Sequence, residues 1–156
     1  MIVLKNGRIW DGENFSIGDV VIEDNVITQI GTVSDATYDY QIDASDAIIC
    51  PGLVDIHTHI RNISCDKFGV QGESSCFPFG VTAVADVSCV TDNKKILDSF
   101  MLKTVVFSCT SIQNNKVDFT QTERVLKNMD AIGIKIFFDK STSTVMDISP
   151  LKEVCD

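Results

Sequence analysis

Short apolar runs separated by turn residues make up the first fifty residues. Asn-Gly, Asp-Gly and Asp-Asn pairs stand between the runs, and such pairs favour tight turns. A turn of this kind is predicted at residues 5–8, which would end the first strand at Leu4. The pattern predicts a small antiparallel β module. Its expected strands cover residues 1–4, 9–10, 19–23, 26–30, 41–44 and 47–50.

From residue 51 onward, apolar runs of strand length alternate with segments of helical period. Helices are expected at residues 92–103, with Asp92 as the N-cap, and at residues 118–129. A shorter helical segment is expected within residues 65–79, and Ser149-Pro150 is typical of one more helix start. The expected strands are buried ones and cover residues 53–59, 80–86, 104–109 and 132–138.

Strands that alternate with helices in this way predict an α/β fold with a parallel sheet. Four such units make half of an eight-stranded (β/α)8 TIM-type barrel, which takes about 250 residues when complete. Residues 51–156 are therefore expected to form the first four β/α units of a barrel. The stretch is interpreted as an incomplete N-terminal part of such a protein.

Composition narrows the possible partners. The chain has 22 acidic and 13 basic residues and a net charge of −9, which argues against a nucleic-acid partner because phosphate binding needs clustered Lys and Arg. No apolar run approaches the roughly 20 residues of a membrane span, and the N-terminal apolar stretch is too short for a signal peptide. A cytoplasmic protein with no membrane partner is expected.

The strongest chemical signal is His57-Thr58-His59, directly after an apolar run. Side chains two positions apart on a strand share a face, so the two imidazoles would converge at the carboxyl end of a strand. Convergent imidazoles suit zinc, nickel, iron or manganese, whereas the plain alternative is two polar residues at a strand end. The sequence contains two histidines in all, so any histidine chemistry must lie here.

The stretch from Pro51 to His59 resembles the first barrel strand of the metal-dependent amidohydrolase superfamily, with Pro-Gly, apolar residues, Asp, an apolar residue and His-x-His. Gly80-Val81-Thr82 is also similar to that superfamily, in its dihydroorotase, hydantoinase and deacetylase branch. The resemblance implies that residues 1–50 are the N-terminal part of a β-sandwich beside the barrel. It also implies hydrolysis of C–N bonds in cyclic amides or N-acyl groups by a metal-activated hydroxide.

The resemblance further implies a set of site residues. His57 and His59 would bind metal, and Lys135, carboxylated by carbon dioxide, would bridge two divalent ions, with zinc as the expected metal. The plain alternative for Lys135 is an amine that reaches solvent from a strand end. Arg61 would bind a substrate carboxylate, with a surface ion pair as the alternative, although Asn62-Ile63-Ser64-Cys65 replaces the acidic-Pro-Gly run usual after that arginine. The catalytic aspartate of strand eight has no counterpart in this stretch.

Three further residues border the expected site. Asp55 is expected to face away from the metal and to accept hydrogen bonds from neighbouring backbone. Asp86 ends the second strand and is a candidate to orient His57 or His59. Cys65 lies six residues after His59, where a thiolate ligand is an alternative to an ordinary loop thiol.

The remaining cysteines show no metal-binding pattern. The six cysteines of the chain are scattered without a Cys-x-x-Cys pair, so reduced thiols are expected. Cys50, Cys89 and Cys109 lie in apolar runs and are expected to be small core residues.

Two functions remain open from the sequence. The first is the hydrolase, favoured by the joint presence of His57, His59 and Lys135. The alternative is a non-catalytic truncated paralogue that acts as a binding or assembly module, favoured by the lack of strands five to eight. The expected partners are further copies of the chain, as a homo-oligomer, and a small-molecule substrate. Dihydroorotate, a hydantoin, an N-acetylated amino acid and a nucleobase amine all remain possible substrates.

Overall fold

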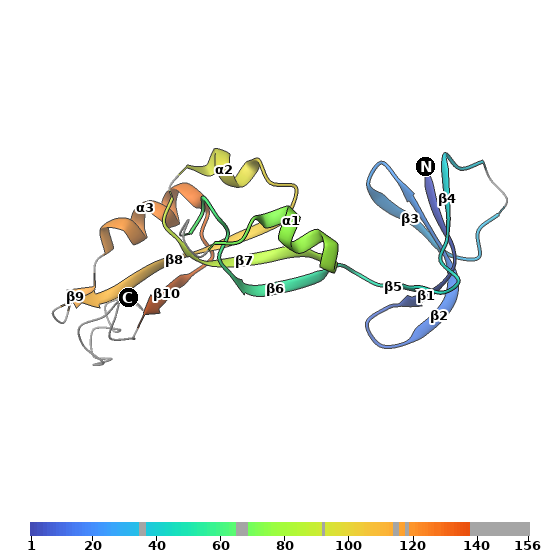
Figure 1. The fold of residues 1–156 in the computed structure, drawn as a ribbon, viewed down its shortest axis with the longest axis horizontal. Coiled ribbons are helices and arrows are strands. Elements are labelled where there is room, and N and C mark those ends of the chain that lie inside the picture. Colours follow the sequence, from blue (N-terminus) through green and yellow to red (C-terminus); the bar gives the residue numbers. More distant parts are fainter. Residues whose placement is uncertain (35–36, 65–68, 92, 114–115, 118, 138–156) are drawn as a thin grey trace. The chain divides into compact units, whose positions relative to one another are not determined.

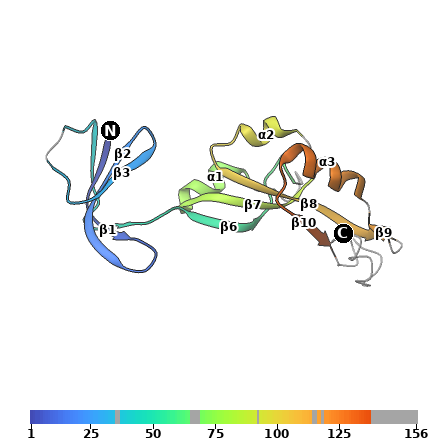
Figure 2. The same ribbon diagram turned by 180° about the vertical axis from the view of Figure 1, so that it is seen from behind.

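A computed structural model describes residues 1–34, 37–64, 69–91, 93–113, 116–117 and 119–137. Contacts divide the chain into two compact units, Met1–Pro51 and Gly52–Asp156. Each unit is built on one sheet (Figures 1 and 2). In the described part, no helix is long and apolar enough to cross a membrane. The helix expected to begin at Ser149 lies outside the described residues.

The first unit is a five-stranded mixed sheet in the order β3-β2-β1-β4, with β5 also paired to β1. β2 (Phe15–Glu23) runs antiparallel to both β1 (Ile2–Trp10) and β3 (Val26–Gly31). β4 (Tyr40–Asp43) and β5 (Ile48–Ile49) run parallel to β1. The prediction of an antiparallel module was therefore wrong for the last two strands, because both return along the edge of β1 that β2 leaves open.

β1 continues through the residues that were expected to form a turn. Its ladder with β2 shifts between Leu4 and Gly7, and Asn6 has a left-handed φ of 63°, so the segment is a bulge and not a hairpin. The buried Asp19 of β2 accepts hydrogen bonds from the Asn6 N–H at 2.8 Å and from the Lys5 amine at 2.9 Å. A carboxylate thus satisfies a donor that the bulge removes from the ladder.

The second unit is a curled parallel sheet in the order β10-β8-β7-β6. The prediction of the first half of a (β/α)8 barrel is confirmed, because consecutive strands are parallel neighbours joined by crossover segments. The strands are β6 (Leu53–Thr58), β7 (Val81–Cys89), β8 (Lys103–Gln113) and β10 (Ile134–Phe137), and β9 (Lys116–Val117) pairs antiparallel with the end of β8.

The crossover segments contain α1 (Gly72–Cys76), the 3-10 turn η1 (Phe77–Phe79), α2 (Lys94–Asp98) and α3 (Phe119–Met129). α3 matches the expected helix, but α2 is much shorter than expected. The Ser99 hydroxyl donates to the Ile96 carbonyl at 2.7 Å directly after α2, and this local bond competes with further helical pairing. The expected N-cap, Asp92, lies outside the described residues, and Asn93 precedes α2 without a side-chain capping bond.

Helices cover one face of the parallel sheet (Figure 1). The other face is open, and Val54 and Ile56 on β6 are 64% and 77% exposed. The expectation of a buried first strand was wrong, because within the described residues β6 pairs with β7 alone and nothing covers its open face. The core on the helix side contains Ile60, Ile63, Cys76, Val84, Cys89, Leu102, Val106, Val125 and Met129.

Candidate metal centre

A bulge at the carboxyl end of β6 decides where the histidines point. Asp55 pairs with Val84 of β7, and the next pair joins Thr58 to Asp86. Between these pairs the chain advances three residues along β6 but only two along β7. Strict alternation would put His57 on the same face as Asp55, but a bulge breaks that alternation. Inside the bulge, the His57 N–H donates to Asp55 Oδ1 at 2.9 Å. Asp55 therefore accepts a backbone hydrogen bond, as expected from the sequence.

Lys135 of β10 lies on the open face of the sheet. Lys135 is in register with Cys109 of β8. Cys109 lies two residues after Phe107 and therefore shares its face of the sheet. The Phe107 side chain lines a hollow of about 390 Å³ on the open face. The Nζ atom of Lys135 lies 3.1 Å from Nε2 of His57, so the His57 ring reaches the same face. The ends of the first and fourth barrel strands thus meet, although β6 and β10 are not neighbours in the sheet.

His59 lies half-buried beside His57, with the two ring centroids 5.8 Å apart and the rings nearly perpendicular. Nδ1 of His59 lies 2.6 Å from Oγ of Ser88, near the end of β7. Because Nδ1 of the ring is already hydrogen-bonded, its Nε2 atom remains available to bind a ligand. The sequence pattern gives no sign of Ser88, because no motif marks a serine that meets a histidine 29 positions away.

Asp86 is fully buried and supports the centre from the helix side of the sheet. Its carboxylate accepts hydrogen bonds from the Ile60 N–H at 2.6 Å, from the Ser88 N–H at 3.0 Å and from the Ser64 hydroxyl. Ile60 directly follows His59, and Ser88 contacts the His59 ring. The expected effect of Asp86 on a histidine therefore passes through these neighbours, because the Asp86 carboxylate does not contact the His59 ring directly.

Arg61 is exposed two residues beyond His59. It lines a hollow of about 340 Å³ together with Glu73 of α1 and Phe100. In the part of the chain that the structure describes, no contact joins its guanidinium to His57 or Lys135. Its role in binding a substrate carboxylate stays a prediction.

Burial affects two thiols near the sheet. Burial raises the pKa of the Cys109 thiol, and the charge of Asp86 acts in the same direction. Burial also raises the pKa of the Cys76 thiol. Both thiols are therefore protonated at neutral pH in the metal-free chain.

The expected core role of three cysteines holds in part. Cys89 is fully buried and Cys109 half-buried. Cys50 is exposed, because it follows the two-residue strand β5 at the edge of the first sheet. Cys65 lies outside the described residues.

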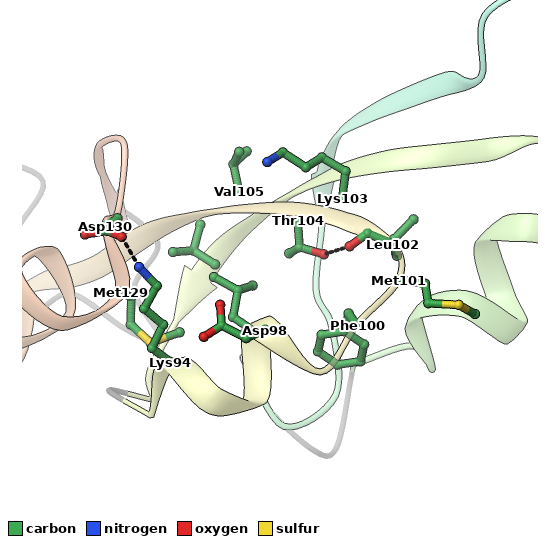
Figure 3. A pocket seen from close by; sticks show the side chains of 12 residues that line it. Lys94, Asp98, Phe100, Met101, Leu102, Lys103, Thr104, Val105, Met129 and Asp130 are labelled. Atoms are coloured by element: carbon green, nitrogen blue, oxygen red, sulfur yellow. Dashed lines mark hydrogen bonds and ion pairs between the residues drawn. The ribbon is translucent and has the colours of Figure 1, made fainter. Parts of the chain in front are cut away.

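Another hollow, of about 460 Å³, lies between α2 and the amino end of β8 (Figure 3). The ion pair between Lys94 and Asp130 stands beside it, and no histidine or cysteine is among the side chains that line it. Active sites of such barrels lie at the opposite end, where the strands end. The two histidines and Lys135 are therefore the better candidate centre.

Known proteins resemble the chain in sequence. No protein-family model matches it. A dihydroorotase of Syntrophotalea carbinolica is 39% identical over 103 residues, which are 60% of this chain and 24% of that protein. A 5-methylthioadenosine/S-adenosylhomocysteine deaminase of Pyrococcus furiosus is 44% identical over 64 residues, which are 40% of this chain and 15% of that protein.

Solved structures share the fold. A dihydroorotase crystal structure superposes with a TM-score of 0.74 at 20% identity, and the match covers 98% of this chain and 47% of that chain. In sequence and in fold, the chain matches the N-terminal part of proteins of the amidohydrolase superfamily. Another member of similar fold, an N-acyl-D-glutamate deacylase from Bordetella bronchiseptica, has a TM-score of 0.62 at 15% identity, over 85% of this chain and 37% of that one.

The chain spans less than half the length of the relatives it matches. Among its described residues, no group of three His, Cys, Asp or Glu side chains is placed to hold a metal ion. A catalytic zinc site uses three protein ligands, and His57 and His59 are two candidates for that role. The Lys135 amine lies beside His57, and it would fit a divalent metal if carboxylation replaced its positive charge with a negative one.

Proposed function

We propose that this chain is part of an amidohydrolase and takes part in metal-dependent hydrolysis of C–N bonds in cyclic amides or N-acyl groups. The observation that carries the proposal is the 3.1 Å contact between Lys135 Nζ and His57 Nε2. It joins the first and fourth strands at the mouth where such barrels carry their active sites. The dihydroorotases and the deacylase that resemble the chain have names that agree with this chemistry, and the deacylase was solved with zinc and a phosphonate mimic of the tetrahedral intermediate.

In this proposal, His57 and His59 hold a divalent metal, with zinc as the first choice, and the carbamate of Lys135 extends the site to a second ion. A bound metal of this kind lowers the pKa of water and polarises a substrate carbonyl. Arg61 is the proposed contact for a substrate carboxylate, because a guanidinium can bind both carboxylate oxygens at once. The substrate is a small molecule.

Lys135 must change chemically before it can bind metal. Its neutral amine attacks the carbon of carbon dioxide, an N–C bond forms, and one proton leaves the nitrogen. The product is a carbamate with one negative charge. An ammonium beside His57 would repel a metal ion, whereas a carbamate would attract it.

The test measures zinc binding by titration calorimetry, with and without bicarbonate. The wild-type chain should bind zinc, and bicarbonate should strengthen binding because it supplies the carbamate. The double variant His57→Ala/His59→Ala should lose binding. Lys135→Ala should lose the bicarbonate effect, whereas Lys94→Ala, a lysine paired with Asp130 at the other end of the sheet, should keep it.

Hydrolysis is then assayed with one cyclic amide and one N-acyl amino acid. Any turnover should collapse in Lys135→Ala and return in part when a short-chain carboxylic acid is added, because a free carboxylate can occupy the vacated bridge. Zinc stoichiometry unchanged in the double histidine variant would move the site elsewhere. Full turnover in Lys135→Ala with unchanged metal content would refute the carbamate and leave a single metal on the histidines.

A further inference from the structure

A chain of hydrogen bonds runs from a buried carboxylate to the ring of His59. The Ser64 hydroxyl donates to Oδ1 of Asp86. Oγ of Ser64 lies 3.2 Å from Oγ of Ser88, and Oγ of Ser88 lies 2.6 Å from Nδ1 of His59. The four side chains come from the end of β6, the loop after it and the end of β7.

Counting protons along this chain gives each contact its direction. A carboxylate accepts hydrogen bonds only, and each serine hydroxyl carries one proton to donate. The Ser64 proton is used on Asp86, so the contact between the two serines requires the Ser88 proton. Ser88 then has no proton left for His59. When both serine contacts are kept as hydrogen bonds, the 2.6 Å contact takes its proton from Nδ1 of His59.

The carboxylate end of the chain is firmly held. Oδ2 of Asp86 accepts from the Ile60 N–H, and Oδ1 accepts from the Ser88 N–H as well as from the Ser64 hydroxyl. Asp86 is 0% exposed, so bulk water does not reach it to take the place of Ser64. The same carboxylate thus fixes the backbone of Ser88 and, through Ser64, the direction of the Ser88 hydroxyl.

A bulge in β7 brings Ser88 to the histidine. The ladder with β8 shifts between Asp86 and Cys89, so three steps on β7 oppose two on β8. Bulges of this kind re-aim side chains near functional sites. Here both Asp86 and Cys89 are buried, while the partly buried Ser88 between them reaches the His59 ring.

We propose that Ser88 is a positioning residue which, with Ser64, fixes His59 as the Nδ1–H tautomer and directs its Nε2 atom to the ligand. A neutral imidazole binds a metal through the nitrogen that carries no proton. Ser88 therefore selects which ring nitrogen is offered. The inference rests on the proposed function only in naming the ligand as a metal, because the tautomer follows from the serine contacts alone.

The test is the tautomer of His59 in the metal-free chain, measured by NMR after ¹⁵N labelling of histidine. The sequence holds two histidines, so a His57→Gln variant assigns both rings. The spectra are recorded at about pH 8.5, well above the ordinary pKa of a free imidazole, which is about 6.5. The wild type should carry the His59 proton on Nδ1.

Ser64→Ala is the decisive variant, because its effect on the ring must pass through Ser88. Loss of its hydroxyl frees the Ser88 proton, which then turns to Nδ1, and His59 shifts to the Nε2–H tautomer. Ser88→Ala should lower zinc affinity about 10- to 100-fold, the usual effect of losing a partner that orients a metal ligand. Ser88→Thr keeps a hydroxyl and should retain the tautomer and the affinity. Ser99→Ala, a serine whose hydroxyl bonds within its own turn, is the matched control and should change neither.

Nδ1–H in the wild type and Nε2–H in Ser64→Ala would support the proposal. Nε2–H in the wild type, or an unchanged tautomer in a folded Ser64→Ala, would overturn it. If Ser64→Ala does not fold, an unchanged His59 tautomer in Ser88→Ala overturns it equally. A wild type that carries Nδ1–H and binds no zinc would refute the proposed metal function and leave the role of Ser88 intact.

Discussion

Replacement of Asp19 by asparagine tests the packing of the first sheet. The Asp19 side chain is buried, and its Oδ1 atom accepts from the Asn6 N–H at 2.8 Å. Its Oδ2 atom accepts from the Lys5 amine at 2.9 Å and from the Val33 N–H at 3.3 Å. Asparagine has the same shape but a single acceptor oxygen. Whichever way the amide is turned, its NH₂ group faces a donor.

The cost follows from the bonds that are lost. With the amide oxygen kept toward Asn6, the substitution removes the bonds from Lys5 and Val33. A hydrogen bond to a charged group contributes about 1.5–3 kcal/mol, and an unsatisfied buried N–H costs about 1–3 kcal/mol. The Lys5 amine is partly exposed and the hydrogen bond from the Val33 N–H is long. The loss of each bond should therefore cost an amount near the lower end of its range. We expect the free energy of unfolding to fall by about 2–4 kcal/mol at neutral pH.

The effect of Asp19 should depend on pH. The Asn6 N–H and then the Lys5 amine hold the pKa of Asp19 below its usual value, which is about 3.9 in an unfolded chain. The stabilisation is therefore complete above about pH 4 and is lost as the pH falls through the lower pKa of the folded state. The asparagine side chain of Asp19→Asn does not bind a proton in this pH range, so it adds no such pH dependence. The stability gap between the two proteins should stay constant above about pH 5 and narrow below about pH 4.

Trp10 makes the measurement specific for this sheet. It is the one tryptophan of the chain and packs against Phe15, with ring centroids 4.7 Å apart. Its fluorescence during urea unfolding therefore reports loss of the β1–β2 pair. Asp46→Asn removes the same charge from an exposed position and should change stability by less than about 0.5 kcal/mol. An Asp19→Asn protein as stable as this control, or a gap that does not narrow in acid, would refute the reasoning.

Two further changes test the second unit. Gly69→Ala should destabilise it, because the new Cβ atom would lie 2.6 Å from the backbone nitrogen of Arg61. Gly72→Ala in α1 meets side chains only at 3.6 Å and should be neutral or stabilise by about 0.5–1 kcal/mol, so equal urea midpoints for the two variants would contradict the steric argument. The open apolar face beside the β6 edge should make the chain self-associate at tens of micromolar, and Ile56→Lys on that face should reduce association measured by light scattering. Met101→Lys, at a residue 82% exposed but away from that face, is the control, and a monomeric wild type would contradict this prediction.

The order of the barrel strands was predictable because each strand is a short apolar run and α3 has a clear apolar stripe. Val125 and Met129 are four positions apart and both are buried against the sheet, as the helical period requires. The approach of Lys135 to His57 also follows from counting strands, because parallel barrel strands end at one mouth. Local pattern and one geometric rule were sufficient for these features.

Other features depend on pairing that the local pattern does not encode. The parallel return of β4 and β5 depends on which edge of β1 is open, and no residue near Tyr40 or Ile48 signals that choice. The contact of Ser88 with His59 depends on a ladder shift in β7, which moves a single serine out of its alternating position. Bulges leave no reliable mark in hydrophobic periodicity, because the shift involves a single residue.

The bulge in β6 also determines how this motif can be transplanted into another parallel barrel. A His-x-His pair grafted onto a strand with perfect register would send its first ring to the helix side, beside the side chain that corresponds to Asp55. The graft must therefore carry the whole segment from Asp55 to Thr58, and the recipient strand must accept one extra residue there. By the same reasoning, deleting one residue between those two positions in this chain would turn His57 away from Lys135 while every ligand stays in the sequence.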